Sequence, residues 1–341
     1  MRAIAYTQTG TPSVLQLVDR EQADPGEGEV RVRVVRSGVN PTDWKSRAGS
    51  GAGQSLPFPE VVPNQDGAGV VDAVGAGVSG VSAGDRVWLY LAAHGRPTGT
   101  AQEFTVVPAE RVVRLPEGIG FDLGASLGVP AMTAHRALTV AEDGPTRLAP
   151  GALAGKTVLV AGGAGAVGHA AIQLARWAGA TVITTISSPE KETLVTAAGA
   201  DHIVNYRTTD AATAIRAIAP NGVDVVVEVS PAQNAELNQT VIANHGTISV
   251  YANNGGSEVT LDVRRHFALN VRYQFLLLYT VGQGALAAAA EDITAALIDG
   301  VLPVGEGAGL PLLHFPLERA AEAHAAVEGG AVGKVLIDVA E

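Results

Sequence analysis

The 341-residue chain has no cysteine, which excludes disulfides and thiolate metal ligands. Its eight histidines are scattered, with no pair at metal-ligand spacing on one helix, so we expect no bound metal. Positive charge is also in short supply, since the net charge is −11 at pH 7. An acidic chain without a Lys/Arg cluster argues against nucleic acid and anionic membrane surfaces as partners.

Aromatic residues are scarce at 4%, and a long unbroken apolar run is missing. The most apolar region, 275–290, is interrupted by Gly282 and Gly284 and followed by Glu291 and Asp292, so it does not predict a membrane span. The N-terminal residues show no signal-peptide pattern. With 47% hydrophobic and 17% charged residues, the sequence predicts a cytoplasmic globular protein with room for two domains.

Glycine, by contrast, is abundant, and its most informative arrangement lies in residues 156–168. A predicted strand at 157–161 leads into the spacing Gly163-x-Gly165-x-x-Gly168, and a predicted helix follows at 166–177. The spacing alone is weak evidence in a chain with 41 glycines, and a purely structural turn is the alternative. The strand before it and the helix after it favour a dinucleotide pyrophosphate site at the helix N-terminus.

The pattern of predicted elements changes at about residue 128. Residues 1–127 contain short β-like runs separated by turn residues and no long helical period, which predicts a β-rich, barrel-like domain. Beyond them, predicted strands and helices alternate, which predicts a doubly wound parallel sheet. The strands are 157–161, 181–186, 224–229 and 247–251, and the helices are 166–177, 190–198, 211–218 and 235–243.

The tail returns to β character at 334–339. A single strand is not stable alone, so we expect this one to rejoin the first domain. The prediction is a discontinuous domain of 1–127 and 303–341, with a nucleotide-binding domain of 128–302 inserted into it.

The end of the second predicted strand indicates which dinucleotide is bound. A carboxylate there would select a free ribose 2′-hydroxyl, whereas this chain has Ser187, Ser188 and, slightly further on, Lys191. These groups can accept a 2′-phosphate, which points to NADPH. Glu190 can point either toward or away from that phosphate. Ser188 also suits a helix N-cap, and Tyr206 is either a phosphate contact or a surface residue.

With these pieces placed, the whole chain resembles the zinc-independent medium-chain dehydrogenase/reductases, and most closely the zeta-crystallin-like quinone oxidoreductases. The resemblance rests on the glycine turn and on motifs in the family's order: 12–15, 38–43, 66–71, 84–87, 129–134, 199–202, 205–207 and 333–334. It implies a GroES-like β-barrel catalytic domain, a Rossmann domain, NADPH as cofactor and a homodimer formed through sheet edges. Zinc-dependent relatives have cysteine and histidine where this chain has Asn40 and Gln65, so the resemblance implies loss of the metal.

The resemblance also assigns residues to the cofactor. Pyrophosphate contacts fall on Ala164, Gly165, Ala166 and Val167, beside Gly163, and 2′-phosphate contacts fall on Ser187, Lys191 and Tyr206. The nicotinamide side is assigned Thr133, Asn234, Tyr251, Ala252, Asn253, Phe275, Leu276 and Leu277. Lys45 stands where the family usually has tyrosine, which leaves the contacts there open.

The resulting hypothesis is hydride transfer from NADPH to a quinone or a conjugated carbonyl compound. Without a metal, hydrogen-bond donors must stabilise the developing oxyanion, and Asn40 and Lys45 are the candidates. Asn40 could instead be a scaffold residue and Lys45 a solvated surface residue. Two alternative functions remain: an enone or enoyl-thioester reductase, and a protein that binds NADPH as a redox sensor without turnover.

Overall fold

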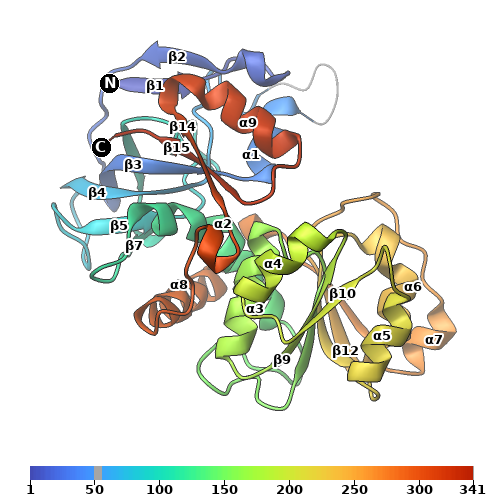
Figure 1. Cartoon of the computed structure of the whole chain (residues 1–341). Helices are drawn as coiled ribbons and strands as arrows, with labels where there is room; N and C mark the ends of the chain where they lie inside the picture. The colour runs from blue at the N-terminus through green and yellow to red at the C-terminus, as the bar shows by residue number, and fades with distance from the viewer. Residues whose placement is uncertain (50–55, 341) are drawn as a thin grey trace. The chain divides into compact units, whose positions relative to one another are not determined.

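Two structural units divide the chain in the computed structural model, which describes residues 1–49 and 56–340 (Figure 1). The first comprises Met1–Val129 and Pro311–Glu341, and the second comprises Pro130–Leu310. The prediction places the second boundary at 302/303, eight residues earlier than the structure does. The difference arises because the carbonyl of Pro303 accepts hydrogen bonds from the side chains of His169 and Gln173, which anchor this segment to the second unit.

The first unit is built on a mixed sheet, in which β14 and β15 pair parallel and the other neighbouring strands pair antiparallel. Its strand order is β14-β15-β3-β4-β5-β7, β6 also pairs with β3, and β1 and β2 form a separate pair. Val30, Val32 and Val34 of β3 are fully buried and alternate with the half-buried Arg31 and Arg33, as expected of a strand with one face on the core. The strands are β1 (Arg2–Ala5), β2 (Gln16–Asp19), β3 (Glu29–Val39), β4 (Asp66–Val74), β5 (Arg86–Leu89), β6 (Phe104–Pro108), β7 (Val112–Arg114), β14 (Leu312–Pro316) and β15 (Lys334–Asp338).

The C-terminal strand β15 pairs antiparallel with β3, with Val335 opposite Val39. This pairing returns the tail of the chain to the first unit, as predicted for a strand that is not stable alone. Figure 1 shows both chain ends on this unit.

Helices in and near the first unit were not anticipated by the strand-like pattern. They are α1 (Pro41–Ala48), α9 (Ala320–Glu328) and α2 (Phe121–Leu138), which begins in the first unit and continues into the second. The expectation of no long helix up to 127 is therefore wrong for α2. Gly124, Gly128 and Pro130 lie within α2 and weaken its helical signal. A Cβ on Gly124 would lie 2.9 Å from the Cβ of Ala68, so close packing on β4 explains this glycine.

The second unit contains a six-stranded parallel sheet in the order β10-β9-β8-β11-β12-β13. Numbered within the unit, this is the 3-2-1-4-5-6 order of a doubly wound dinucleotide fold, which confirms the predicted fold class. The strands are β8 (Thr157–Val160), β9 (Thr181–Ile186), β10 (His202–Asn205), β11 (Val223–Glu228), β12 (Ile242–Val250) and β13 (Arg272–Phe275). The helices are α3 (Ala166–Trp177), α4 (Pro189–Ala197), α5 (Ala211–Ile218), α6 (Pro231–Val241), α7 (Val263–Phe267) and α8 (Gln283–Ile298).

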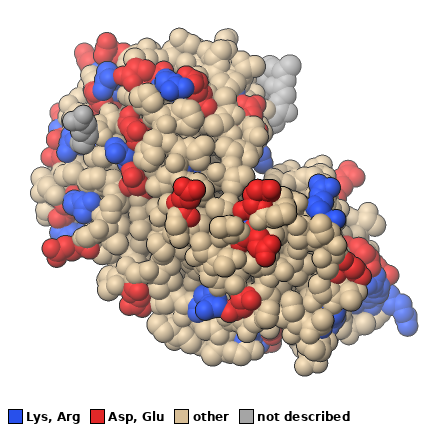
Figure 2. All heavy atoms as spheres, in the orientation of Figure 1, with Lys and Arg blue, Asp and Glu red and all other residues tan. Residues whose placement is uncertain are grey.

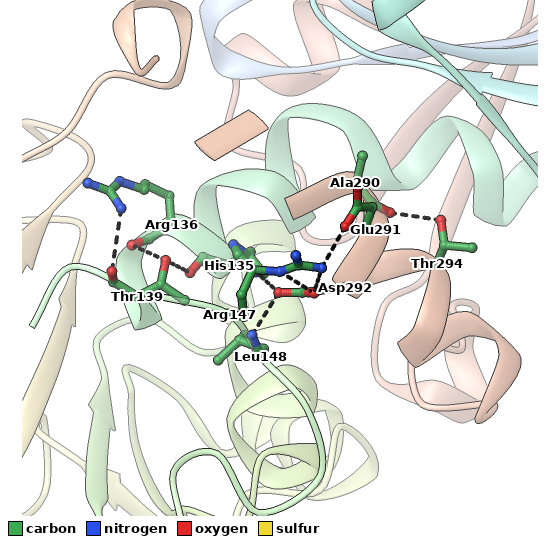
Figure 3. A network of polar contacts seen from close by, with 9 residues as sticks. All are labelled: His135, Arg136, Thr139, Arg147, Leu148, Ala290, Glu291, Asp292 and Thr294. Atoms are coloured by element: carbon green, nitrogen blue, oxygen red, sulfur yellow. Dashed lines mark hydrogen bonds and ion pairs between the residues drawn. The ribbon is translucent and has the colours of Figure 1, made fainter. Parts of the chain in front are cut away.

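A buried carboxylate joins three segments of the second unit (Figure 3). Asp292 of α8 accepts hydrogen bonds from Nε2 of His135 at 2.8 Å and from the backbone N–H of Leu148 at 2.7 Å. The Arg147 guanidinium donates two more, at 2.6 and 2.8 Å. Burial raises the pKa of Asp292, but these donors outweigh it and hold the pKa below the usual range. The carboxylate therefore clamps the end of α2 and the loop that follows it onto α8.

The surface carries both signs of charge. Figure 2 shows Lys and Arg side chains dispersed among Asp and Glu on the face drawn. Within residues 1–49 and 56–340, no helix combines the length and the apolarity needed to cross a bilayer.

Candidate functional site

Most of the cofactor residues predicted in the second unit gather at one edge of the parallel sheet. The register aligns Val160 of β8 with Thr184 of β9 and Val227 of β11, and it aligns Val250 of β12 with Glu228 and Phe275. The glycine turn and the segments around 187, 230, 251 and 276 all follow the carboxyl ends of these strands. Ligands of open α/β sheets bind at this edge.

The glycine turn is shaped by close packing. A Cβ on Gly163 would lie 2.1 Å from Oγ1 of Thr184, and one on Gly168 would lie 2.5 Å from the carbonyl oxygen of Gly162. Gly165 is different, because it is exposed and occupies the N-cap of α3. A Cβ there would meet only the Gly162 carbonyl oxygen, at 3.5 Å. The first and last glycines thus set the turn and the helix packing, and the middle one leaves the helix N-terminus accessible to an anion.

The other predicted pyrophosphate residues continue from this glycine. Ala166 and Val167 form the first turn of α3 and are half-buried, whereas Ala164 is buried. The amide groups at a helix start have no partner within the helix, so this turn can bind phosphate oxygens.

The residues predicted to bind the 2′-phosphate lie together. Nζ of Lys191 donates to Oγ of Ser187 at 2.9 Å, and both side chains are half-buried. The backbone N–H of Tyr206 bonds to the carbonyl of Ile186, the residue before Ser187. Tyr206 is 48% exposed, and the centre of its ring lies 5.7 Å from the guanidinium carbon of Arg207. An ammonium, a hydroxyl and a phenol therefore stand at adjacent strand ends.

Ser188 and Glu190 contact each other at the start of α4. Ser188 occupies the N-cap of α4 with Pro189 after it, but its side chain does not cap the helix backbone. The Ser188 hydroxyl instead donates to Glu190, which holds the pKa of that carboxyl below its usual range. Glu190 is exposed and ionised one residue from Lys191. Its negative charge, like that of the exposed Glu192 in the same turn, opposes binding of a 2′-phosphate.

On the predicted nicotinamide side, the structure shows a carboxylate that the sequence analysis did not single out. Glu228, at the end of β11, is fully buried and accepts hydrogen bonds from the Ser230 backbone, from Asn234 Nδ2 at 2.9 Å and from Asn238 Nδ2 at 2.6 Å. The predicted cofactor residue Asn234 is thus partly committed to a structural role. Burial, with the Glu228 charge, raises the pKa of Tyr251, so its phenol stays protonated.

The remaining predicted residues differ in accessibility. Ala252 is half-buried and Asn253 exposed, both after β12, and Thr133 is buried within α2. Phe275 and Leu277 are 62% and 53% exposed, whereas Leu276 between them is buried.

Asn40, the predicted oxyanion donor, belongs to a buried polar cluster in the first unit, which we call the Asn40 cluster (Asn40, Asp43, Asp66 and Lys334). Asn40 caps α1 and is 2% exposed. Its Nδ2 donates to Oδ2 of Asp66 at 2.7 Å, and its Oδ1 accepts from Nζ of Lys334 at 2.7 Å. Asp43 accepts from the backbone N–H groups of Asn40 and Gln65. The scaffold interpretation of Asn40 therefore has direct support, and one Nδ2 hydrogen is left for a further acceptor.

The charges of the Asn40 cluster are strongly perturbed. Burial raises the pKa of Asp43 to about 7, and the nearby charge of Asp66 adds to that shift. Burial also raises the pKa of Asp66 and lowers that of Lys334, while their mutual attraction opposes both shifts. Asp66 accepts a third bond, from the backbone N–H of Val129 at 2.8 Å.

Lys45, the second catalytic candidate, lies in the last turn of α1 and is exposed. Its ammonium is 5.9 Å from the centre of the Trp44 ring. This exposed position is consistent with both alternatives for Lys45, a solvated surface residue and a donor that contacts the substrate.

The positions that hold metal ligands in zinc-dependent relatives carry amides. Asn40 is engaged as described, and Oε1 of Gln65 is buried without a hydrogen-bond partner among the described residues. Within residues 1–49 and 56–340, no group of three or more His, Asp or Glu side chains is arranged to hold a metal ion.

Comparisons with known proteins cover both units. Residues 26–117 match the family described as alcohol dehydrogenase GroES-like domain, and residues 166–295 match the one described as zinc-binding dehydrogenase. A quinone oxidoreductase of Rattus norvegicus is 31% identical over 99% of this chain and 97% of its own length. The structure of Escherichia coli quinone oxidoreductase complexed with NADPH is 26% identical, with a TM-score of 0.81 over 99% of this chain and 100% of that one. The CurK enoyl reductase structure is 25% identical, with a TM-score of 0.81 over 99% of each chain.

Proposed function

Because this chain belongs to the zinc-independent medium-chain dehydrogenase/reductase family of quinone oxidoreductases, we propose that it reduces quinones with NADPH. The observation that carries this proposal is the convergence of the glycine turn with Ser187 and Lys191 at the carboxyl edge of the parallel sheet. The glycine turn can bind a pyrophosphate, and Ser187 with Lys191 can bind a 2′-phosphate. We also propose a cytoplasmic location, as the sequence predicts.

The described residues fit NADPH. Gly165 leaves the N-terminus of α3 open to phosphate oxygens, and the Lys191 ammonium supplies positive charge beside two hydroxyls. Asn253 after β12, Phe275 at the end of β13 and Leu277 beyond it are exposed and are available to the rest of the cofactor. Asn234 supports this edge through its hydrogen bond to the Glu228 carboxylate, and Tyr251 through its backbone N–H, which donates to the Glu228 carbonyl.

Held by these residues, NADPH would supply one hydride, equivalent to two electrons and a proton, to the acceptor. The quinone becomes a quinol anion, and a proton from solvent completes the quinol. Negative charge develops on the acceptor oxygen during this transfer, so donors placed at that oxygen lower the barrier. The second Nδ2 hydrogen of Asn40 and the Lys45 ammonium are our candidates for these donors.

Steady-state oxidation of NADPH with a panel of acceptors tests the proposal. The panel holds 1,4-benzoquinone, 1,4-naphthoquinone, cyclohex-2-enone and crotonyl-CoA. We expect the highest kcat/KM with a quinone. The likeness to an enoyl reductase structure favours enone or enoyl-thioester reduction as the second candidate, and higher kcat/KM with these acceptors would establish it. Tight NADPH binding without turnover on any acceptor would contradict both and support a redox sensor.

Lys191 is expected to set the preference for NADPH over NADH. A charge-assisted hydrogen bond to phosphate contributes about 1.5–3 kcal/mol, so Lys191→Ala should raise the Kd of NADPH about 10- to 100-fold. NADH lacks the 2′-phosphate, so its Kd should stay the same. Glu190→Gln, which removes the opposing charge next door, should tighten NADPH binding. Fluorescence titration with both cofactors measures these constants, and equal losses for NADH and NADPH would contradict this role of Lys191.

We propose that two copies of the chain associate through the free edge of β13. Support comes from exposed apolar side chains on α7, which precedes β13 in the chain: Phe267 is 63% exposed and Val263 is 72% exposed. Sedimentation velocity should give twice the 34.7 kDa chain mass. Val263→Glu should shift the equilibrium toward monomers, whereas Ile298→Glu on α8 should leave it unchanged. A monomeric wild-type chain would refute the proposal.

A further inference from the structure

Lys334, at the start of β15, is a fully buried lysine. Lysine is almost never fully buried unless it is paired. Its Nζ donates to Oδ1 of Asn40 at 2.7 Å and lies 3.4 Å from Oδ2 of Asp66. The ammonium thus reaches Asn40 and its partner carboxylate from another strand of the same unit.

These contacts fix how the Asn40 carboxamide is oriented. An ammonium group only donates hydrogen bonds and a carboxylate only accepts them. Lys334 therefore selects the amide oxygen and Asp66 selects the amide nitrogen, each at 2.7 Å. If the amide were flipped, its NH₂ group would face the Lys334 ammonium, which is also a donor, and its oxygen would face the Asp66 carboxylate, which is also an acceptor. The backbone of Asn40 is fixed as well, because its N–H donates to Oδ2 of Asp43 at 2.7 Å.

We propose that Lys334 is a positioning residue for quinone reduction and acts through Asn40. It holds the carboxamide so that the second Nδ2 hydrogen is free for the acceptor oxygen. It also places a positive charge at the amide oxygen, which makes the N–H groups stronger donors as negative charge develops. This inference rests on the proposed function, in which Asn40 contacts the acceptor.

A double-mutant cycle tests the coupling. Lys334→Met, Asn40→Ala and the double variant are compared with the wild type, using saturating NADPH and 1,4-naphthoquinone. Since loss of one oxyanion donor costs about 10²–10³ in kcat, we expect Lys334→Met to lower kcat about 10- to 100-fold. Its Kd for NADPH should not change, because the predicted NADPH contacts lie in the other unit. Adding Lys334→Met to Asn40→Ala should cause no further loss. Lys156→Met, at an exposed lysine, is the control and should match the wild type.

The pH dependence of kcat distinguishes a positioning role from a purely structural one, because loss of a purely structural lysine would not change it. The charged groups facing Lys334 are Asp66 of β4 and Asp43 of α1. Burial lowers the pKa of Lys334 below its ordinary value, so wild-type kcat should fall as alkaline pH removes the charge. Lys334→Arg keeps its charge at every accessible pH, so the alkaline fall should disappear.

A third readout does not depend on turnover. In ¹⁵N spectra of the wild type without NADPH, the Asn40 side-chain amide should exchange slowly with solvent, and Lys334→Met should accelerate that exchange. This measurement also applies if the arginine variant does not fold.

The results separate this inference from the proposed function. Wild-type turnover with quinones decides the function. The ratio of variant to wild-type kcat decides the role of Lys334. An unchanged kcat in Lys334→Met, or losses that multiply fully in the double variant, would overturn the inference while leaving quinone reduction intact. A wild-type enzyme without quinone turnover would overturn both.

Discussion

Asp66→Ala is expected to lower the free energy of unfolding of the first unit by about 3–5 kcal/mol. The substitution removes the carboxylate nearest to the buried Lys334 ammonium and leaves only Asp43 to compensate that charge. It also removes the acceptor of the Asn40 Nδ2 group and of the Val129 backbone N–H. In a Trp177→Phe background both remaining tryptophans lie in the first unit, and Trp88 is fully buried on β5, so urea denaturation followed by tryptophan fluorescence reports on this unit.

Asp72→Ala is the matched control for this prediction, because Asp72 lies on the same strand and pairs with Arg31 at the surface. Exposed pairs contribute only about 0–1 kcal/mol, so its loss should be small. Equal midpoints for the two variants would show that the Asp66–Lys334 pair does not stabilise the fold.

Gly168→Ala is expected to weaken NADPH binding about 10- to 100-fold. The new Cβ would lie 2.5 Å from the Gly162 carbonyl oxygen and 2.8 Å from Cα of Gly163. Both neighbours are backbone, so α3 must move away from the turn at a cost of about 1–3 kcal/mol. Each 1.4 kcal/mol corresponds to about tenfold in Kd if the strain falls on the bound state. Isothermal titration calorimetry with NADPH measures the change.

Two further glycines sharpen this experiment. Gly282→Ala, at a position where a Cβ meets nothing within 4 Å, should change neither binding nor stability. Gly165→Ala should keep the stability of the wild type but lose affinity, because its methyl group enters the space through which phosphate oxygens reach the backbone. If Gly168→Ala bound NADPH like the wild type, the packing argument for the turn would be wrong.

Much of the second unit could be predicted from the sequence, because its signals are local. Predicted helices at 166–177 and 211–218 agree with α3 and α5 as observed, and the repeated strand–helix alternation implies the parallel sheet. The glycine spacing and the absence of a carboxylate at Ser187 and Ser188 are likewise contained within short segments. These signals are the hydrophobic period, the turn residues and the helix N-termini. Each spans only a few neighbouring residues, so it can be recognised in the sequence without knowledge of the fold.

The helix α2 shows where such local reasoning ends. Gly124 and Gly128 lower its intrinsic helix propensity, and the reason for them lies in distant residues. A Cβ on Gly128 would fall 2.1 Å from Oδ1 of Asp66, so close approach to that carboxylate requires a glycine here. Tertiary packing overrides propensity at such positions.

By itself, then, the sequence determined the fold class and the type of cofactor site, since both depend on neighbours along the chain. The tertiary structure decided what surrounds Asn40. Lys334 is 294 residues away from Asn40 in the chain, and only the pairing of β15 with β3 brings the two together. Glu228 illustrates the same point, because its burial beneath Asn234 and Asn238 follows from how α6 packs on β11. Burial and contacts between distant residues determine the ionisation and orientation of these side chains, and no local sequence pattern predicts them.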